Sequence, residues 1–386
     1  MSRLLARLNP EQRRAAETTE GPVLVLAGAG TGKTRVITYR IAHLLERGVP
    51  PSAVLAMTFT NKAAGEMRER VGELVGRRLA KELTIGTFHA FCLRALRSHA
   101  DALGMPRGFT ICDASDQMSA VKNALRELHV PEAALRPRDL HAEISLLKNG
   151  LVSPEQYLEQ AADDREQLIG RAYRRYDDHL RRARSLDFDD LLLRTVDLLR
   201  DHPALRDAFR HRYRYVLVDE FQDTNRPQFE IVKGIAGGHR NLCVVGDDDQ
   251  SIYGWRGADV RLILDFERHF PGAAVVRLET NYRSTDPILE AANAVIANNP
   301  GRHEKRLRSH LGGGEDVAVV VHEDEEKEAE SVVFDIVGKV QRRDLAYRDF
   351  AILFRTAPQA RAFETVLRQH AVPYVLVGGM SFFDRK

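Results

Sequence analysis

A glycine-rich segment near the N-terminus constrains the fold more than any other part of the chain. The apolar run Val23–Leu26 is typical of a strand buried on both faces of a parallel sheet. A glycine loop follows it, and apolar residues then recur at helical spacing as far as Leu45, with Gly48 as a stop. Strand, glycine loop and helix in this order are the context that a P-loop requires. The sequence therefore predicts an α/β fold of the P-loop type.

The chemistry of this loop follows from its residue types. Glycines let backbone N–H groups approach a phosphate, and the N-terminus of the following helix favours an anion. We expect the Lys33 ammonium to reach the β- and γ-phosphates and the Thr34 hydroxyl to hold Mg²⁺. The first position is Ala27 instead of the strict motif's glycine. A glycine-rich turn that binds nothing is the alternative, and the flanking strand and helix argue against it.

Two further apolar runs carry polar residues at their ends. Tyr215–Val218 is followed by Asp219 and Glu220, and Leu242–Val245 is followed by a polar segment that extends to Ala258. Asp219 is placed to bind Mg²⁺, and Glu220 is placed to position and deprotonate an attacking water. Ligands of open α/β sheets bind at the carboxyl ends of strands. We therefore expect both segments at the same sheet edge as the glycine loop.

The segment from Val245 to Ala258 combines two kinds of chemistry. Its acids, Asp247–Asp249, and the amide of Gln250 suit a metal-phosphate site, whereas its aromatic residues and Arg256 suit a surface on which bases stack. Trp255 is the only tryptophan of the chain, and a place in the core is the alternative for it. One segment that touches both a nucleotide and a nucleic acid is able to couple them.

Composition narrows the function classes. At 386 residues the chain suggests two or three domains, and 57 basic against 55 acidic residues give a net charge of only +2. Nucleic-acid contacts must then use local patches, for which Arg171–Arg184 and Arg302–Arg308 are candidates and solvated helix faces are the alternative. The three cysteines show no paired spacing, and neither a signal peptide nor a membrane-spanning run is present. These features predict a cytoplasmic protein with no membrane partner.

The order of elements predicts the domain organisation. Strands and helices alternate to about Phe91, the pattern is almost wholly helical from Cys112 to about Arg210, and alternation resumes at Tyr215. This order predicts a helical insertion into a parallel-sheet domain. A second α/β unit begins near Thr280, with strands expected at 317–321, 351–354 and 374–377 and helices at 325–340 and 360–370. A last strand without a closing helix predicts truncation.

Several motifs in this order resemble the UvrD/PcrA/Rep family of superfamily 1 DNA helicases. The resemblance covers essentially the entire chain and is nearest to UvrD and PcrA. It implies a first RecA-like ATPase core formed by residues 1–91 and 184–279, an inserted helical subdomain at 92–183, and the N-terminal part of a second RecA-like core at 280–386. Family members continue into motifs V and VI, so the resemblance implies that this second core is incomplete.

The resemblance also assigns nucleotide-site roles. In the Q motif, Leu8–Gln12, Gln12 reads the adenine edge, and Tyr282 stacks on adenine opposite Arg35. Gln250 senses the γ-phosphate, and Arg283 binds it when the two cores close, with Glu220 as base. The metal residues are Thr34 and Asp219. The full set expected to bind ATP is Gln12, Gly28, Ala29, Gly30, Thr31, Gly32, Lys33, Thr34, Arg35 and Tyr282.

DNA contacts are implied for three other segments. Thr58–Ala64 resembles motif Ia, Gly86–Phe91 resembles the next DNA-contacting motif, and Val245–Ala258 resembles motif III. The residues expected to contact DNA are Phe59, Thr60, Asn61, Thr87, His89, Tyr253, Trp255 and Arg256. Asp187–Leu191 matches a short family motif, and an N-cap with acids that favour the helix dipole is its alternative role.

The function implied is that of an ATP- and Mg²⁺-dependent 3′–5′ DNA helicase that acts on single-stranded and 3′-tailed duplex DNA, in repair or replication, with repair proteins as partners. One alternative is an ATP- and single-strand-binding module that does not unwind. DNA-stimulated ATP turnover separates these two. Another alternative is the helicase subunit of a helicase-nuclease of the RecB or AddA type, which tends to carry a larger helical insertion.

Overall fold

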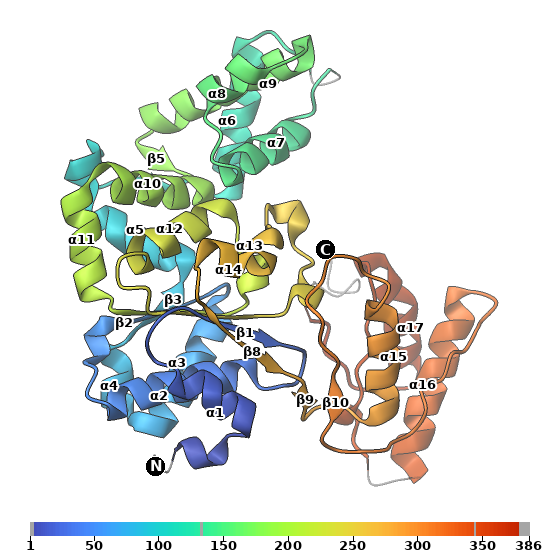
Figure 1. The fold of residues 1–386 in the computed structure, drawn as a ribbon. Coiled ribbons are helices and arrows are strands. Elements are labelled where there is room, and N and C mark those ends of the chain that lie inside the picture. Colours follow the sequence, from blue (N-terminus) through green and yellow to red (C-terminus); the bar gives the residue numbers. More distant parts are fainter. Residues whose placement is uncertain (1–3, 132–133, 343–344, 378–386) are drawn as a thin grey trace. The chain divides into compact units, whose positions relative to one another are not determined.

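The computed structural model describes residues 4–131, 134–342 and 345–377. The chain divides between Glu315 and Asp316 into two compact units. The first unit is built on a six-stranded sheet with the order β3-β2-β6-β7-β1-β8 (Figure 1). All its pairings are parallel. Its strands are β1 Val23–Ala27, β2 Val54–Thr58, β3 Thr84–Thr87, β6 Tyr215–Val218, β7 Leu242–Gly246 and β8 Ala274–Leu278.

The register of the sheet brings strand ends level with one another. Leu26 lies opposite Gly246, and Met57 lies opposite Val218 in the neighbouring pair. The loops that follow β1, β2, β6 and β7 therefore leave the sheet at one edge. This confirms the expectation that the glycine loop, the paired acids and the polar segment after β7 share the carboxyl edge.

Helices cover both faces of this sheet, in two layers that Figure 1 shows. Successive strand residues alternate between faces, so that Val23 and Val25 join one apolar cluster and Leu24 and Leu26 join the other. One face carries α1 Pro10–Glu17, α2 Lys33–Glu46, α3 Asn61–Val75 and α4 Arg77–Glu82. The other face carries α5 Phe88–His99, α10 Phe188–Asp201, α12 Arg226–Ala236, α13 Arg261–Leu264 and α14 Phe266–His269, with α11 Pro203–Arg212 against α10 and α12.

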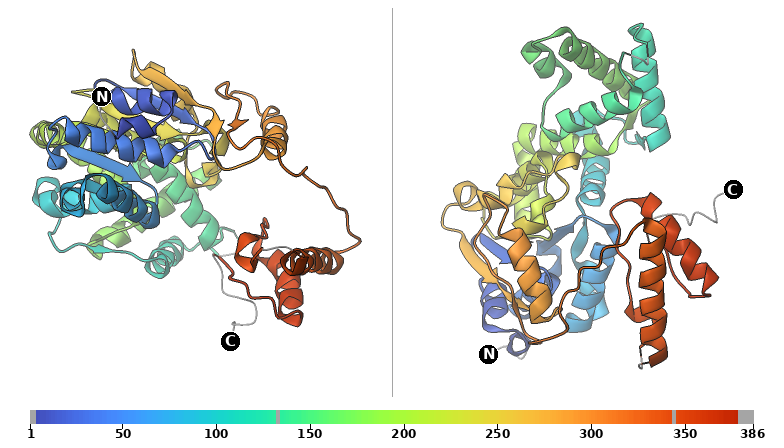
Figure 2. Two further views of the ribbon diagram at one scale, coloured as in Figure 1. Left: turned by 90° about the horizontal axis from the view of Figure 1, so that it is seen from below. Right: turned by 90° about the vertical axis from the view of Figure 1, so that its right-hand side faces the viewer.

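The helices between β4 Thr110–Ile111 and β5 Ser185–Leu186 have an apolar core of their own. The chain leaves the first unit's sheet layers through β4 and returns through β5, which pairs with it in parallel. The expected boundary at residue 92 falls inside α5, which packs into the sheet's core beyond that point. Figure 2 shows the inserted helices gathered apart from the sheet. They are α6 Ala114–Glu127, α7 Pro137–Asn149, α8 Pro154–Gln160 and α9 Asp164–Arg182.

The segment that follows β8 stays with the first unit. It contains β9 Thr280–Asn281, α15 Asp286–Ile296 and β10 Arg308–Ser309, and β10 pairs in parallel with β9. The sequence pattern predicts that the second α/β unit begins near Thr280. The structure divides the units about thirty-five residues later, between Glu315 and Asp316. Asn281 explains part of this placement, because its amide donates a hydrogen bond to the carbonyl oxygen of Ala29 in the glycine loop.

The second unit contains both of its expected helices, as α16 Glu325–Arg342 and α17 Ala360–Gln369. The strands expected at 317–321, 351–354 and 374–377 are wrong: these runs are not paired as strands among the described residues. An apolar run becomes a strand only when a neighbouring backbone takes its hydrogen bonds. Val319 and Val377 are accordingly 89% and 88% exposed.

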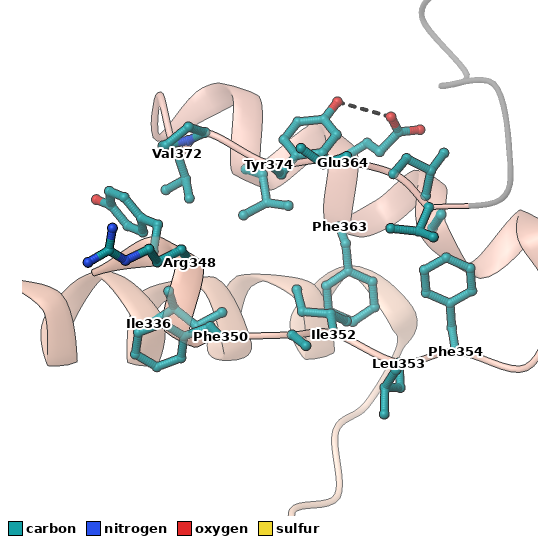
Figure 3. Close-up of a pocket in the computed structure, with 18 residues that line it drawn as sticks. Ile336, Arg348, Phe350, Ile352, Leu353, Phe354, Phe363, Glu364, Val372 and Tyr374 are labelled. Carbon is teal, nitrogen blue, oxygen red and sulfur yellow. Dashed lines mark hydrogen bonds between the residues drawn. The ribbon is translucent and has the colours of Figure 1, made fainter. Parts of the chain in front are cut away.

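A hollow of about 780 Å³ lies within this second unit, between α17 and the unpaired runs (Figure 3). Its walls are mostly apolar, including Ile352, Phe354 and Phe363. Glu364 accepts a hydrogen bond from the Tyr374 hydroxyl at 3.0 Å.

No helix within the described residues is long and apolar enough to cross a membrane.

Candidate functional site

The glycine loop between β1 and α2 is held open by its own backbone and by its neighbours. Gly30 and Gly32 have φ angles of +70° and +91°, which side-chain-bearing residues rarely adopt. The Thr31 hydroxyl donates to the carbonyl oxygen of Gly28 at 2.8 Å, and Gln12 Nε2 donates to that of Thr31 at 2.9 Å. From the other side, the backbone N–H of Tyr282 donates to Gly30 O at 2.9 Å.

Lys33 begins α2 with an unusual environment for a cation. Its Nζ atom is buried and has no hydrogen-bond partner among the described residues. The nearest opposite charge is Glu220 Oε2 at 3.5 Å. A buried ammonium without a hydrogen-bond partner has donors to spare for a ligand, and a phosphate fits that need. Thr34, the next residue, is half-buried at the same helix N-terminus.

Asp219 and Glu220 follow β6 as expected. Burial, reinforced by the neighbouring charge of Glu220, raises the pKa of Asp219 to about 7. Burial and Glu220 likewise raise the pKa of Asp223 to about 6, and its Oδ1 has no hydrogen-bond partner in the part of the chain described. Such carboxyl groups favour a bound cation, since a metal ion stabilises their charged form. Asp219 and Thr34 offer oxygen ligands of the kind that Mg²⁺ takes, and phosphates or water would complete its coordination. No cluster of three or more His, Cys, Asp or Glu ligands occurs in the described ranges.

Gln222 is a site residue that sequence reasoning missed. Its Nε2 donates to Glu220 Oε2 at 3.0 Å, and its Oε1 accepts from the backbone N–H of Asp247 at 2.9 Å. Gln250 Nε2 in turn donates to Asp247 Oδ2 at 2.5 Å. Lys33, Glu220, Gln222, Asp247 and Gln250 therefore form one polar chain across the sheet edge. The sequence signal for Gln222 was its place in Val218–Asn225, a segment that resembles motif II of the helicase family.

The three acids after β7 are neutralised by cations of the chain itself. Lys305 Nζ lies 3.0, 2.6 and 2.7 Å from carboxylate oxygens of Asp247, Asp248 and Asp249, and its side chain is 2% exposed. Arg302 makes two hydrogen bonds of 2.7 Å to Asp249. This corrects two expectations. The acids do not stand free for a metal, and two cations of the Arg302–Arg308 patch are engaged in ion pairs.

The residues expected around adenine are only partly together. Tyr282 lies beside the glycine loop, and its hydroxyl accepts a hydrogen bond from Asn9 Nδ2 at 2.9 Å. Gln12 is buried, with its amide committed to Thr31 and to the capping box of α1. The Arg35 guanidinium lies 5.2 Å from the Tyr39 ring centre and donates to the carbonyl oxygen of Arg7.

Arg283 lies at the loop as well. A Cβ atom on Gly30 would stand 2.8 Å from its Cβ, so the two backbones approach closely. The backbone N–H of Arg283 donates to Asn281 Oδ1 at 2.8 Å. Its place is therefore set by the same asparagine that holds the glycine loop.

The turn after Gln250 exposes aromatic side chains. Trp255 is 69% exposed, which rules out a place in the core. The Arg256 guanidinium lies 4.5 Å from the Trp255 ring centre and 5.6 Å from that of Tyr253. Exposed aromatic rings with a cation over them suit base stacking.

The helices α3 and α5, which follow β2 and β3, begin at the same sheet edge. The Thr60 hydroxyl caps α3 by accepting from the Ala63 N–H, and the Thr87 hydroxyl caps α5 by accepting from the Ala90 N–H. Phe59 is half-buried, Asn61 is exposed, and burial lowers the pKa of His89. Phe188 is a second residue that sequence reasoning missed. It is 51% exposed, with its ring 5.7 Å from that of His89.

The Arg171–Arg184 patch is a solvated helix face. Arg174, Arg175 and Arg181 are paired with acids of the insertion. Tyr173 and Tyr176 are buried in the insertion's core, so they present no ring to a base. The structure therefore supports a solvated helix face for Arg171–Arg184 and not a nucleic-acid contact.

Comparison with known proteins identifies relatives along the whole chain. Residues 8–271 match the family model of the UvrD/REP helicase N-terminal domain, and residues 276–386 match that of the UvrD-like helicase C-terminal domain. ATP-dependent DNA helicase PcrA of Staphylococcus aureus (strain Mu50) is 46% identical over 387 residues, which is 100% of this chain and 53% of the relative. PcrA of Staphylococcus epidermidis (strain RP62A) shows the same identity and coverage. The chain thus spans about half the length of these curated relatives.

Proposed function

Because the chain belongs to the UvrD/REP helicase family, we propose that it forms the ATP-driven motor part of a DNA helicase. The observation that supports this most is the polar chain from Lys33 through Glu220, Gln222 and Asp247 to Gln250. Gln250 lies five residues before the exposed Trp255. These contacts would connect a nucleotide bound at the glycine loop with a base stacked on the aromatic turn, so that binding at one place affects the other.

The groups proposed to hold the nucleotide come from the glycine loop and the strand ends beside it. The loop from Gly28 to Gly32 offers backbone N–H groups to the phosphates, and the free donors of Lys33 offer a positive charge to the β- and γ-phosphates. Thr34 and Asp219 would hold Mg²⁺, which neutralises phosphate charge during phosphoryl transfer. Tyr282 is proposed to stack on adenine, and its backbone N–H donates a hydrogen bond to Gly30 O of the loop.

Glu220 is the proposed general base. It accepts a proton from the water whose oxygen attacks the γ-phosphorus, while the bond from that phosphorus to the leaving ADP oxygen breaks. Gln222 holds its carboxylate through the hydrogen bond to Oε2. Gln250 and Arg283 are proposed to meet the charge that develops on the γ-phosphate. Arg283 lies on the segment that follows β8, and the hydrogen bond from its backbone N–H to Asn281 holds it beside the loop.

Single-stranded DNA is the proposed nucleic-acid ligand. The capped N-termini of α3 and α5, at Thr60 and Thr87, suit backbone phosphates. Tyr253 and Trp255 suit stacking on bases, with Arg256 over both rings. Phe188 and His89, whose ring centres are 5.7 Å apart, offer a second aromatic surface.

The finer assignments rest on the family alone. We infer a 3′–5′ polarity on single-stranded and 3′-tailed DNA, a role in repair or replication, a cytoplasmic location and repair proteins as partners. The proposed domain division is a first RecA-like core with a helical insertion and the beginning of a second RecA-like core. The PcrA relatives support an ATP-dependent DNA helicase over a helicase-nuclease subunit.

The test uses the complete protein that carries this sequence. ATP hydrolysis is measured with and without oligo-dT, and unwinding is measured on duplexes with 3′ or 5′ tails. The proposal expects strong stimulation by DNA and unwinding of the 3′-tailed duplex. DNA-stimulated hydrolysis without any unwinding would indicate a translocase that is not a helicase. Nucleotide binding without hydrolysis would support the binding-module alternative.

A further inference from the structure

A buried polar junction lies where the insertion meets the first unit's sheet layers. Lys148, on the last turn of α7, has a side chain that is 0% exposed. Its Nζ lies 3.3 Å from Asp177 of α9, and 2.8 Å from both Asp187 and Asp190 at the start of α10. Asp187 also caps α10 and accepts a hydrogen bond from the Tyr176 hydroxyl at 2.8 Å. The Asp187–Leu191 motif is therefore an N-cap that also anchors the end of α7.

Asn149, the last residue of α7, extends this junction toward the proposed DNA site. Its Nδ2 donates to the carbonyl oxygen of Ser145 at 2.8 Å and to Asp189 Oδ1 at 3.3 Å. Its Oδ1 accepts from Asn225 Nδ2 at 2.5 Å. Asn225 caps α12, the helix that follows the acids Asp219 and Glu220. One buried amide thus joins the insertion to the segment that leaves the nucleotide site.

The aromatic turn is fastened at the same point. Asn225 forms an antiparallel bridge with Ala258, and the Asp259 N–H donates to the carbonyl oxygen of Thr224 at 3.0 Å. Gly257, which ends the turn with a φ of +84°, approaches so closely that a Cβ atom there would stand 2.7 Å from Asn149 Cβ. The exposed Trp255 lies two residues earlier. The Trp255 ring contacts Tyr253 and Arg256 of the same turn. The orientation of the turn therefore depends on the contacts at its end.

From this juxtaposition we infer that Asn149 is a positioning residue for the base-stacking turn. It ties the inserted helices and the N-cap of α12 to the turn that carries Trp255, and so holds that turn ready for single-stranded DNA. The inference rests on the proposed function, because it assumes that the turn binds bases. Asn149 itself is 7% exposed and touches no ligand in this assignment.

Two substitutions remove the central contact from opposite sides. Asn149→Ala deletes the amide but keeps the Cβ that packs on Gly257. Asn225→Ser deletes the donor to Asn149 but keeps an oxygen that can cap α12, since serine is a favoured N-cap residue. Asn123→Ala is the matched control, because Asn123 lies on α6 of the same insertion, where its side chain accepts a local hydrogen bond from Arg126.

The experiment measures oligo-dT affinity of the 386-residue chain by the fluorescence of Trp255, its sole tryptophan. Loss of one buried hydrogen bond corresponds to about a three- to tenfold weaker affinity. We expect that loss for Asn225→Ser and at least that loss for Asn149→Ala, which also removes the hydrogen bonds to Ser145 and Asp189. The double variant should bind no more weakly than Asn149→Ala, since the Asn149–Asn225 contact is already lost there. Affinity for a fluorescent ADP analogue should stay within about twofold, and Asn123→Ala should match the parent chain.

A merely structural role gives a different pattern. Asn149→Ala would then lower the melting temperature but leave oligo-dT affinity unchanged well below that temperature, which would overturn the inference. Additive losses in the double variant would overturn it too. If Asn149→Ala does not fold, Asn225→Ser alone decides the outcome.

Failure of the proposed function is separately recognisable. A parent chain that does not bind oligo-dT contradicts the DNA-binding proposal, and the positioning claim is then decided without DNA. In that case the anisotropy decay of Trp255 is compared among the variants. Faster local motion in Asn149→Ala and Asn225→Ser than in Asn123→Ala supports the inference, and equal motion overturns it.

Discussion

At the scale of single residues, the carboxylate of Glu220 is the group on which hydrolysis should depend most. It lies 3.5 Å from Lys33 Nζ and is held by Gln222. Glu220→Gln keeps the shape of the side chain but cannot accept a proton, so turnover in the complete protein should fall by about 10²–10⁴-fold. Binding of ATP and Mg²⁺ should persist. Steady-state ATPase assays with oligo-dT test this, with Glu230→Gln, paired to Arg226 on α12, as the matched control.

Near-normal DNA-stimulated turnover by Glu220→Gln would show that another group is the base. Equal losses in both glutamine variants would point instead to a general effect of removing a carboxylate from this unit.

Asp219 gives a prediction about pH. Its folded-state pKa is about 7, above the ordinary value of 3.8, so the folded chain keeps a proton that the unfolded chain loses. Its contribution therefore lowers the stability of the folded state as pH rises from about 4 to about 7. Without Mg²⁺, Asp219→Asn should raise the free energy of unfolding at pH 8 by about 1–3 kcal/mol. The gain should disappear as the pH is lowered toward 4.

Denaturant titrations followed by Trp255 fluorescence at pH 4.5 and pH 8 check this, since they report on the unit that contains Asp219. A gain of equal size at both pH values, or a loss at pH 8, would contradict a proton held by Asp219.

At the scale of elements, the loop after β7 depends on a cation from the segment before β10. Lys305 contacts all three carboxylates of Asp247–Asp249 in a buried setting. Lys305→Met leaves two of these acids without their cation, and breaking a buried ion pair in this way typically costs about 3–5 kcal/mol. Lys122→Met, at an exposed position of α6, should change the stability by less than about 1 kcal/mol.

Chemical denaturation of both methionine variants measures this difference. Equal stability of Lys305→Met and Lys122→Met would mean that the acids find other partners or protons at no cost. A restored stability when Asp248→Asn is added to Lys305→Met would support the charge explanation.

At the scale of the whole molecule, the two units should unfold separately. The first unit buries two large apolar clusters on the faces of its sheet, whereas the second buries a small one. Trp255 reports only on the first unit, while circular dichroism at 222 nm reports on the helices of both. We expect the dichroism transition to begin at a lower temperature than the fluorescence transition.

Limited proteolysis provides an independent measurement, because cleavage should start within the second unit, where Leu353 and Val377 are almost fully exposed. Coincident optical transitions, together with equal calorimetric and van't Hoff enthalpies, would show that the chain unfolds as one cooperative unit.

Local patterns in the sequence were enough to predict the sheet edge. The runs at β1, β6 and β7, the glycine loop and the acids at Asp219 and Glu220 all follow from residue type at short spacing. Strand, loop and helix are decided within some twenty residues, where backbone preferences and the alternation of apolar residues act. The helical insertion was visible for the same reason, since its helices show their own periodicity and caps.

Pairing between distant segments was decided only by the tertiary structure. Lys305 reaches acids more than fifty residues away, and Asn149 meets Asn225 across seventy-six residues. The sequence marks these residues as ordinary polar side chains, because a buried partner depends on where other elements pack. The runs after Asp316 show the converse. Their composition predicts strands, but a strand exists only where a neighbouring backbone completes its hydrogen bonds, and this depends on segments far apart in the chain.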